Sequence, residues 1–109
     1  MYLPMFSESI ERIQKGEKTT TLRSLKCDYE IGENLTLEGT ALRIQITDRQ
    51  RITLPDDLTP QIAQGEGYTS VQEMMDTMLA RYRGKLVPQW WLYTFALVLP
   101  TTPIAELSL

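Results

Sequence analysis

The segment QWWLYTFALVL, residues 89–99, most constrains the fold of this chain. Its aromatic and branched side chains favour a β-strand, and they suit a strand that is partly covered on both faces. The apolar run from Trp90 to Leu99 has ten residues, which is too short to span a bilayer as a helix. We therefore expect a long strand near the C-terminus that is packed between other elements.

A second strand pattern occupies residues 42–54, where apolar and polar side chains alternate. The alternating apolar residues are Leu42, Ile44, Ile46, Ile52 and Leu54. This period of two is typical of a half-buried strand. The sequence DRQR at 48–51 interrupts it, which predicts a bend or hairpin nearby. Shorter strands are expected at TTTLR, residues 19–23, and at LTLEG, residues 35–39.

The first of three predicted helices lies near the N-terminus. Phe6, Ile10 and Ile13 recur at spacings of four and three, which places them on one face of a helix. Ser7 is the expected N-cap and Gly16 the expected stop signal.

Two more helices are predicted before the last strand. In the second, Thr59 is the expected cap, Pro60 fits the first turn, and Gly65 and Gly67 break the helix. The third begins at residue 69 or 70, carries the clearest apolar stripe in the chain, and ends at Gly84.

The composition limits how the fold can be stabilised. The chain has no histidine and one cysteine, Cys27, so an internal disulfide is excluded and a His-based zinc site is too. With 109 residues, 42% of them apolar, it can bury one modest core.

Helices separated among antiparallel strands indicate an α+β fold, and the short strands fit a small, partly closed β-barrel with helices packed at its ends. We assign residues 1–99 to this domain and residues 100–109 to a C-terminal tail.

The charge balance narrows the choice of partners. Eleven Lys and Arg against fourteen Asp and Glu give a net charge of −3, whereas proteins that bind nucleic acid polymers through phosphates usually carry a basic excess. A small nucleoside ligand or a local basic pocket remains compatible with this balance.

The N-terminus lacks the basic start and apolar core of a signal peptide. We expect a cytoplasmic protein with no membrane segment, metal or cofactor; its oligomeric state is left open.

The sequence GEKTTTLR, residues 16–23, contains the first candidate chemistry. Lysine, with a pKa of ~10.4, becomes a base only when burial or a nearby cation such as Arg23 lowers that pKa. A threonine hydroxyl becomes a nucleophile when a base removes its proton. Lys18 and Thr21 would point to opposite faces of a regular strand, so they converge only if Lys18 lies in the turn. The alternative is a solvated lysine beside an ordinary threonine-rich strand.

Glu66 is the second candidate because it stands between Gly65 and Gly67, where backbone can approach a ligand closely. A carboxyl group in a pocket acts as a general acid when burial raises its pKa. The alternative is an exposed glutamate at the end of a helix.

Aromatic and basic residues give weaker signals. Trp90 and Trp91 are adjacent and face opposite sides of a strand, so one of them can line a pocket and stack on a base, or pack in the core. Tyr68 is a further stacking candidate. A loose basic group consists of Arg43, Arg49 and Arg51, for which a solvated strand face is the alternative.

Several segments, taken in order, resemble the ASCH domain family, whose fold is a PUA-like β-barrel. The family's signature G-x-K-x-x-E/T-x-R matches GEKTTTLR, with Thr21 at the variable position. Three further segments match features of the family. IGENL matches a glycine followed by an acidic residue, and AQGEGY matches a segment that precedes a helix. WWLYTFALV matches the closing aromatic strand. The resemblance covers about residues 3–99.

The threonine variant of the signature resembles the N4-acetylcytidine amidohydrolase branch of that family. These small enzymes remove the acetyl group from the exocyclic nitrogen of N4-acetylcytidine without a metal. By motif position, the resemblance implies Thr21 as nucleophile, Lys18 as its proton acceptor and Glu66 as proton donor to the leaving amine. Arg23 matches the motif's arginine and is expected to orient the motif, tune Lys18 or contact substrate.

Further substrate contacts are expected around the same site. The residues concerned are Gly65, Gly67, Tyr68 and Trp90, together with Arg23. Backbone N–H groups near the two glycines are candidate donors to the developing oxyanion.

A noncatalytic RNA- or nucleotide-binding module is the alternative function. The wider family carries glutamate at the position of Thr21, and many of its members are thought to bind RNA without known catalysis. The expected contacts in that case are Arg43, Arg49, Arg51 and an exposed tryptophan. The sequence does not distinguish a free nucleoside from RNA as substrate, or one acyl group from another.

Overall fold

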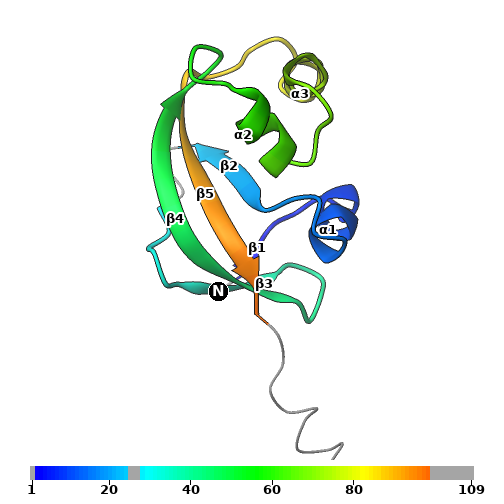
Figure 1. The fold of residues 1–109 in the computed structure, drawn as a ribbon, viewed down its shortest axis with the longest axis vertical. Coiled ribbons are helices and arrows are strands. Elements are labelled where there is room, and N and C mark those ends of the chain that lie inside the picture. The colour runs from blue at the N-terminus through cyan, green and yellow to red at the C-terminus, as the bar shows by residue number, and fades with distance from the viewer. Residues whose placement is uncertain (1, 25–27, 99–109) are drawn as a thin grey trace, which may run out of the picture.

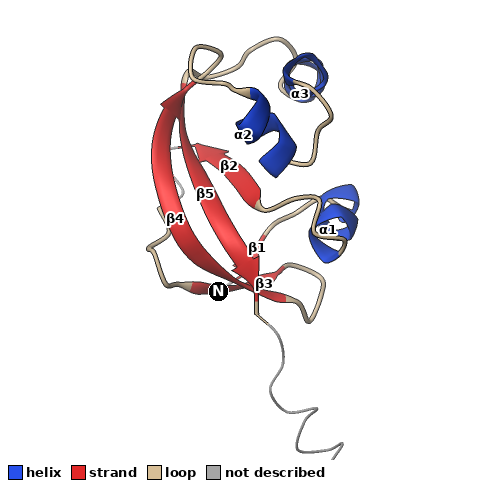
Figure 2. Ribbon diagram, viewed as in Figure 1, coloured by secondary structure: helices blue, strands red, loops and turns tan. Residues whose placement is uncertain are grey.

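The structure is a computed structural model that describes residues 2–24 and 28–98. It contains a five-stranded mixed sheet and three helices (Figures 1 and 2). The strands are β1 (Tyr2–Leu3), β2 (Thr20–Ser24), β3 (Asn34–Leu37), β4 (Arg43–Thr53) and β5 (Gln89–Leu97). The helices are α1 (Ser7–Gln14), α2 (Pro60–Gly65) and α3 (Val71–Arg81). The predicted α+β class is therefore confirmed, whereas the predicted tail from residue 100 and Cys27 lie outside the described residues.

The order of the strands leaves β2 at one edge of the sheet. Across the sheet the order is β1-β3-β4-β5-β2, with β1 parallel to β3 and the other neighbours antiparallel. An edge strand offers unpaired backbone groups on its outer side. One contact links β2 to the segment after β1, because Nη2 of Arg23 donates to the carbonyl oxygen of Pro4 at 2.6 Å.

The predicted interruption in the second strand pattern is a β-bulge, not a hairpin. Strand β4 runs on through residues 48–51, but its register against β5 shifts between Ile46, which pairs with Phe95, and Asp48, which pairs with Thr94. An extra residue on one strand changes which of its side chains face each side. The even-numbered apolar residues of β4 therefore face opposite sides of the sheet before and after the bulge.

The bulge allows the long strands to serve two cores. The first core contains Leu3, Ile13, Tyr29, Leu35, Leu37, Ile44, Ile46, Tyr93 and Phe95. The second contains Ile52, Leu54, Ala63, Met74, Met78, Trp90 and Leu92. Phe95 and Trp90 are odd and even residues of one strand, so the two cores lie on opposite faces of β5. The expectation that this strand is covered on both faces agrees with the structure.

Two of the three N-cap residues that the sequence predicts are found at the starts of the helices. Thr59 accepts a hydrogen bond from the Ile62 amide at 3.2 Å, and Ser70 accepts one from the Glu73 amide at 3.0 Å, so both act as N-caps. The expected cap at Ser7 is wrong: Phe6 occupies the N-cap position, with no side-chain hydrogen bond. No helix among the described residues has the length and apolar character needed to cross a membrane.

Candidate functional site

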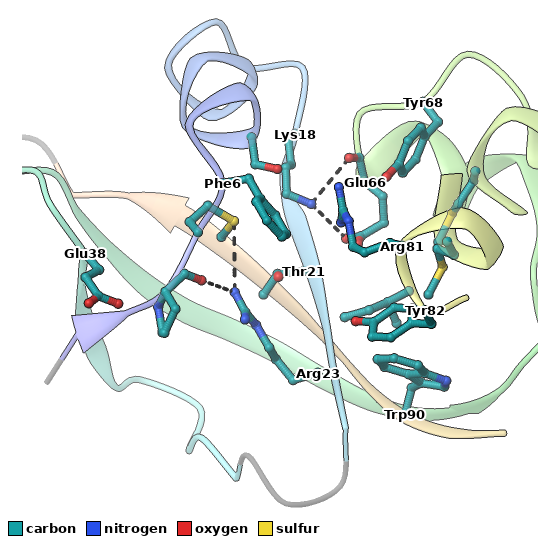
Figure 3. A pocket seen from close by; sticks show the side chains of 16 residues that line it. Phe6, Lys18, Thr21, Arg23, Glu38, Glu66, Tyr68, Arg81, Tyr82 and Trp90 are labelled. Atoms are coloured by element: carbon teal, nitrogen blue, oxygen red, sulfur yellow. Dashed lines mark hydrogen bonds and ion pairs between the residues drawn. The ribbon is translucent and has the colours of Figure 1, made fainter. Parts of the chain in front are cut away.

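A cavity of about 510 Å³ opens along the free edge of β2 (Figure 3). The segment before and into α1, the strand β2, the end of α2 and the helix α3 all contribute to its wall. Of the eight residues predicted for the catalytic and substrate-binding site, six line the cavity: Lys18, Thr21, Arg23, Glu66, Tyr68 and Trp90. The other two, Gly65 and Gly67, are not among its lining residues.

Lys18 lies in the turn between α1 and β2, as the proposed convergence requires. Helix α1 ends at Gln14, and β2 begins only at Thr20. The amide of Lys18 donates to the carbonyl oxygen of Arg12 at 3.2 Å, which fixes this turn. Its amine is directed inward and the residue is only 6% exposed.

Glu66 is held at the C-terminal end of α2 by a Schellman motif. The Gly67 amide donates to the Gln64 carbonyl at 2.9 Å, and the Tyr68 amide donates to the Ala63 carbonyl at 2.9 Å. Gly67 has a φ of +94°, which explains why a glycine follows Glu66. The motif fixes the backbone from which the Glu66 side chain enters the cavity.

The two glycines bring α2 close to β2 and its preceding turn. The Thr19 amide donates to the Gly65 carbonyl at 2.7 Å. A Cβ at Gly65 would lie 3.2 Å from two side-chain atoms of Thr20, and one at Gly67 would lie 3.0 Å from Cδ of Arg12. Since the Gly67 amide is already donated within the Schellman motif, the structure gives these glycines a packing role in place of the expected contact with an oxyanion.

The amine and the carboxyl group meet in the interior. Nζ of Lys18 lies 3.4 Å from Oε2 of Glu66, and it also donates to the backbone oxygen of Glu66 at 3.3 Å. Glu66 is 7% exposed. The two groups enter the cavity from separate elements, as Figure 3 shows.

Burial moves both pKa values toward the neutral forms. Desolvation lowers the pKa of the Lys18 amine from 10.5; the nearby Glu66 carboxylate opposes this shift, and the cations of Arg23 and Arg12 add to it. Desolvation raises the pKa of the Glu66 carboxyl group from 4.5, opposed by Lys18 and by the hydrogen bond from Thr20. A neutral amine is a base and a protonated carboxyl group is an acid, and the two shifts run toward these forms.

Two adjacent threonines of β2 have different roles. The Thr20 hydroxyl donates to Oε2 of Glu66 at 2.5 Å. Thr21 points to the other face of the strand, where it lines the cavity, is 4% exposed and makes no hydrogen bond through its hydroxyl to any other residue that the structure describes. Sequence reasoning identified Thr21 and missed the support that Thr20 gives to Glu66.

The free edge of β2 adds a backbone donor to the site. The Phe95 amide donates to the Thr19 carbonyl at 3.0 Å. Because hydrogen bonds alternate along an antiparallel pair, the Leu22 amide points away from β5. It donates to the Glu66 carboxylate, which lowers the pKa of that group. The position of β2 at the edge of the sheet is therefore what allows its backbone to reach the site.

Aromatic side chains form one wall of the cavity. Trp90 is 3% exposed, and its indole N–H donates to the Val87 carbonyl at 2.6 Å. Its ring meets that of Tyr82 edge to face, with 5.6 Å between centroids. Tyr68 is half-buried beneath the Arg12 guanidinium, 5.6 Å from its ring centroid. Burial raises the pKa of the Tyr68 hydroxyl.

Sequence reasoning missed several residues of this cavity. Phe6 and Arg81 both line it, with the guanidinium carbon 4.2 Å from the ring centroid, and Tyr82 lines it as well. No motif marks these residues, because each is an ordinary helix or turn residue until the fold brings α3 opposite the segment before α1.

The basic group predicted on the second strand is partly neutralised. Arg49 pairs with Asp28 at 2.8 Å and with Glu30 at 3.6 Å. It also stacks on Trp91, as does Arg51, at 5.2 and 5.8 Å from the ring centroid. Among the described residues there is no group of three or more His, Cys, Asp or Glu side chains that could hold a metal ion.

Comparison with known proteins adds information on the fold. No family model matches this sequence, and no curated protein matches it. The solved structures with a similar fold include three at 16–18% identity. The hypothetical protein PH0355 has a TM-score of 0.69, with 87% of this chain and 95% of that chain covered.

Protein EF3133 from Enterococcus faecalis V583, of the family model DUF984, has a TM-score of 0.66, with 89% of this chain and 79% of that chain covered. An ASCH domain from Lactobacillus crispatus JV V101 has a TM-score of 0.65, with 89% of this chain and 77% of that chain covered. The chain therefore has the fold of ASCH domain structures.

Proposed function

We propose that this chain with an ASCH domain fold is a metal-independent amidohydrolase that removes the acyl group from N4-acetylcytidine or a related acylated nucleoside. The observation that carries the proposal is the buried Lys18–Glu66 pair, with its amine 3.4 Å from the carboxyl oxygen, in the cavity that Thr21 lines. Both pKa shifts run toward the neutral amine and the protonated carboxyl group, which are the forms that act as base and acid.

Acylation of the enzyme is the first step. The neutral Lys18 amine takes the proton of the Thr21 hydroxyl while the threonine oxygen forms a bond to the acyl carbon. The carbonyl electron pair moves onto its oxygen and then returns as the bond between carbon and the cytosine nitrogen breaks. The protonated Glu66 carboxyl group gives its proton to the departing amine. Cytidine leaves, and the acyl group stays on Thr21 as an ester.

Hydrolysis of this ester completes the cycle. The Glu66 carboxylate takes a proton from water, whose oxygen attacks the ester carbon, and the protonated Lys18 amine returns a proton to the Thr21 oxygen as the ester bond breaks. The sum is an amide and water converted to an amine and a carboxylic acid. Both protein groups end in their starting states.

The cavity suits a nucleoside in size and in chemistry. Its volume of about 510 Å³ lies in the range of small-molecule sites. The Trp90, Tyr82 and Tyr68 rings offer an apolar wall to a planar base. We assign substrate contact to Tyr68, Trp90 and Arg23, and assign Gly65 and Gly67 to the support of Glu66. A nucleoside substrate and a single cysteine fit a cytoplasmic enzyme.

The proposal is tested by incubating purified protein with a panel of N4-acylated cytidines and following the products by mass spectrometry. We expect cytidine and the matching carboxylate, and no product from the Thr21→Ala variant. Failure of the wild-type protein to deacylate any member of the panel would contradict the proposed activity.

One observation favours the alternative of an RNA-binding module. The guanidinium groups of Arg49 and Arg51 both contact the ring of Trp91, and aromatic rings combined with cationic groups are a surface that binds single-stranded nucleic acid. The ion pairs of Arg49 with Asp28 and Glu30 count against it. RNA affinity that falls with salt, without hydrolysis, would favour this function over the amidohydrolase.

A further inference from the structure

A contact between Phe6 and Arg81 joins two sides of the cavity at its mouth. Phe6 stands directly before α1 and Arg81 is the last residue of α3, and in Figure 3 the two side chains approach each other from these elements. The guanidinium carbon lies 4.2 Å from the ring centroid. Both residues line the cavity and both are exposed, Phe6 by 58%. A ring that stacks on a guanidinium group holds it in place while leaving its N–H donors to a ligand.

The positive charge of Arg81 has no partner in the protein. Among residues 2–24 and 28–98, its guanidinium group forms no ion pair and no hydrogen bond. The carboxyl groups of Glu66 and Glu73 are occupied elsewhere, because Glu66 pairs with Lys18 and Glu73 accepts hydrogen bonds from the amide and the hydroxyl of Thr69. An unpaired cation at the mouth of a cavity attracts an anionic ligand.

A second arginine adds positive charge on this side of the cavity. The guanidinium carbon of Arg12 lies 5.6 Å from the ring centroid of Tyr68, and Arg12 forms no ion pair with any residue that the structure describes. Burial raises the pKa of the Tyr68 hydroxyl, and the cations of Arg81 and Arg12 oppose that shift, so both charges act on the same cavity residue. A chain with a net charge of −3 thus has a local group of cations around Tyr68.

The orientation of a bound nucleoside places its ribose near these cations. Thr21 and Glu66 are 4% and 7% exposed, so the acyl group and the nitrogen that carries it have to reach the interior. In cytidine the ribose is attached to the opposite side of the pyrimidine ring from that nitrogen. The ribose therefore lies toward the mouth, where Phe6 and Arg81 are exposed. A phosphate group on this ribose carries a charge of about −1.5 to −2 at pH 7, and a guanidinium group binds phosphate through two parallel hydrogen bonds.

We propose that Arg81, positioned by Phe6, binds a phosphate group on the ribose, so that the substrate of this site is an acylated cytidine monophosphate; this inference rests on the proposed function. The cavity of about 510 Å³ has the size of a site for one small molecule. A phosphate monoester carries more negative charge than the diester linkage of RNA. The net charge of −3 also disfavours a polyanion. A mononucleotide fits these observations better than RNA does.

The first experiment compares substrates that differ only in the phosphate. It measures kcat/KM for N4-acetylcytidine and for its 5′- and 3′-monophosphates with the wild type, Arg81→Gln and Arg83→Gln. The last variant is the matched control, because it removes the same charge two residues away and Arg83 does not line the cavity. We expect the wild type to prefer the better monophosphate over the nucleoside by about 10–100-fold, Arg81→Gln to lose most of that preference, and Arg83→Gln to keep it. A wild type without the preference, or an Arg81→Gln variant that retains it, would overturn the inference.

Phe6→Leu tests the positioning role of the aromatic ring. This variant keeps an apolar side chain at the mouth but removes the ring on which the Arg81 guanidinium group lies. We expect the preference for the monophosphate to fall severalfold in a protein that thermal melting shows to be folded. A preference equal to that of the wild type would overturn the role of Phe6.

An oligonucleotide with one internal N4-acetylcytidine separates RNA from a mononucleotide as the source of the phosphate. We expect it to be hydrolysed more slowly than the better monophosphate. Faster hydrolysis of the oligonucleotide would assign these cations to RNA and overturn the inference.

A binding measurement separates this inference from the proposed function, because it needs no catalysis. Titration calorimetry compares cytidine with its 5′- and 3′-monophosphates. We expect one monophosphate to bind the wild type more tightly than cytidine, with an advantage that shrinks at high salt and is lost in Arg81→Gln. Deacylation by a protein that binds cytidine and its monophosphates equally overturns the inference alone. Tighter binding of a monophosphate through Arg81, without deacylation of any substrate, overturns the amidohydrolase and keeps the phosphate site.

Discussion

The Lys18 amine lies 3.4 Å from a carboxyl oxygen of Glu66, although the two residues are 48 positions apart in the sequence. A turn places the lysine before β2, and a Schellman motif places the glutamate after α2. Both residues are buried, so each charged form carries a desolvation cost that its partner only partly offsets. We propose that this pair acts as an acid and a base and is not primarily a stabilising ion pair.

The two neighbouring threonines should respond differently to mutation. Thr21→Ala removes the proposed nucleophile, and we expect at least a ~10³-fold loss of kcat. Thr20→Ala removes one donor to Glu66, worth about 1 kcal/mol, and should lower kcat about fivefold. Steady-state kinetics on purified variants measures both.

The conservative Thr20→Ser variant is the control for packing against Gly65. It keeps the hydroxyl and should retain most of the activity. If Thr20→Ala proved as inactive as Thr21→Ala, the two roles would have been assigned to the wrong threonines.

The pH dependence of kcat/KM should be bell-shaped. Lys18 must be deprotonated, so activity rises with pH through its lowered pKa, and Glu66 must be protonated, so activity falls through its raised pKa. Because the groups interact, the two limbs report the pair. In Glu66→Gln the alkaline limb should disappear and the acid limb should move to lower pH, since the carboxylate no longer raises the pKa of Lys18. An alkaline limb that survives in this variant would assign the acid to another group.

Stability should depend on pH through the same carboxyl group. Between 4.5 and the raised pKa of Glu66, the folded state binds more protons than the unfolded state, so the free energy of unfolding falls as pH rises. Glu66→Gln does not titrate. We therefore expect the stability of the wild type relative to this variant to decline from pH 4.5 upward, as measured by urea denaturation at a series of pH values. A relative stability that grows over this range would show that the folded state depresses the pKa of Glu66.

Gly67→Ala should damage both stability and activity. Its φ of +94° costs a side chain ~1–2 kcal/mol, and the new Cβ would lie 3.0 Å from Cδ of Arg12 and 3.5 Å from Cβ of Lys18. Gly32→Ala is a matched control, because φ is +92° there and nothing lies within 4 Å of the added atom. We expect both variants to lose stability by denaturation, Gly67→Ala more than Gly32→Ala, and kcat to fall only in Gly67→Ala. Equal kcat values in Gly67→Ala and Gly32→Ala would show that catalysis does not depend on the Schellman motif.

Local signals in the sequence were sufficient to predict most of the helices and strands. Pro60 and the caps at Thr59 and Ser70 act within one turn of a helix, so their effects do not depend on distant contacts. The short strand β1 was missed because two residues carry no period, and its pairing with β3 depends on the whole sheet. The bulge at Ile46 was read as a bend for a related reason, since register is a property of two strands.

Site residues could be predicted only where a short stretch of sequence marks them. Lys18 and Thr21 could be paired from their spacing, with the condition that Lys18 precede the strand, and the structure meets that condition. Glu66 could be named as an acid, but its burial comes from the packing of α2 on β2. Arg81 and Phe6 join the cavity through tertiary contacts alone. No pattern along the chain identifies such residues.

Rapid quenching of the reaction with N4-acetylcytidine tests directly whether Thr21 carries the acyl group. Lys18 and Glu66 are expected to move only protons. Intact mass and fragmentation of the peptide covering residues 19–23 then locate any acetyl group. We expect one acetyl group on Thr21, and we expect both this group and the formation of cytidine to disappear in Thr21→Ala. An acetyl group on Thr20 or on Lys18, or normal turnover by Thr21→Ala, would contradict it.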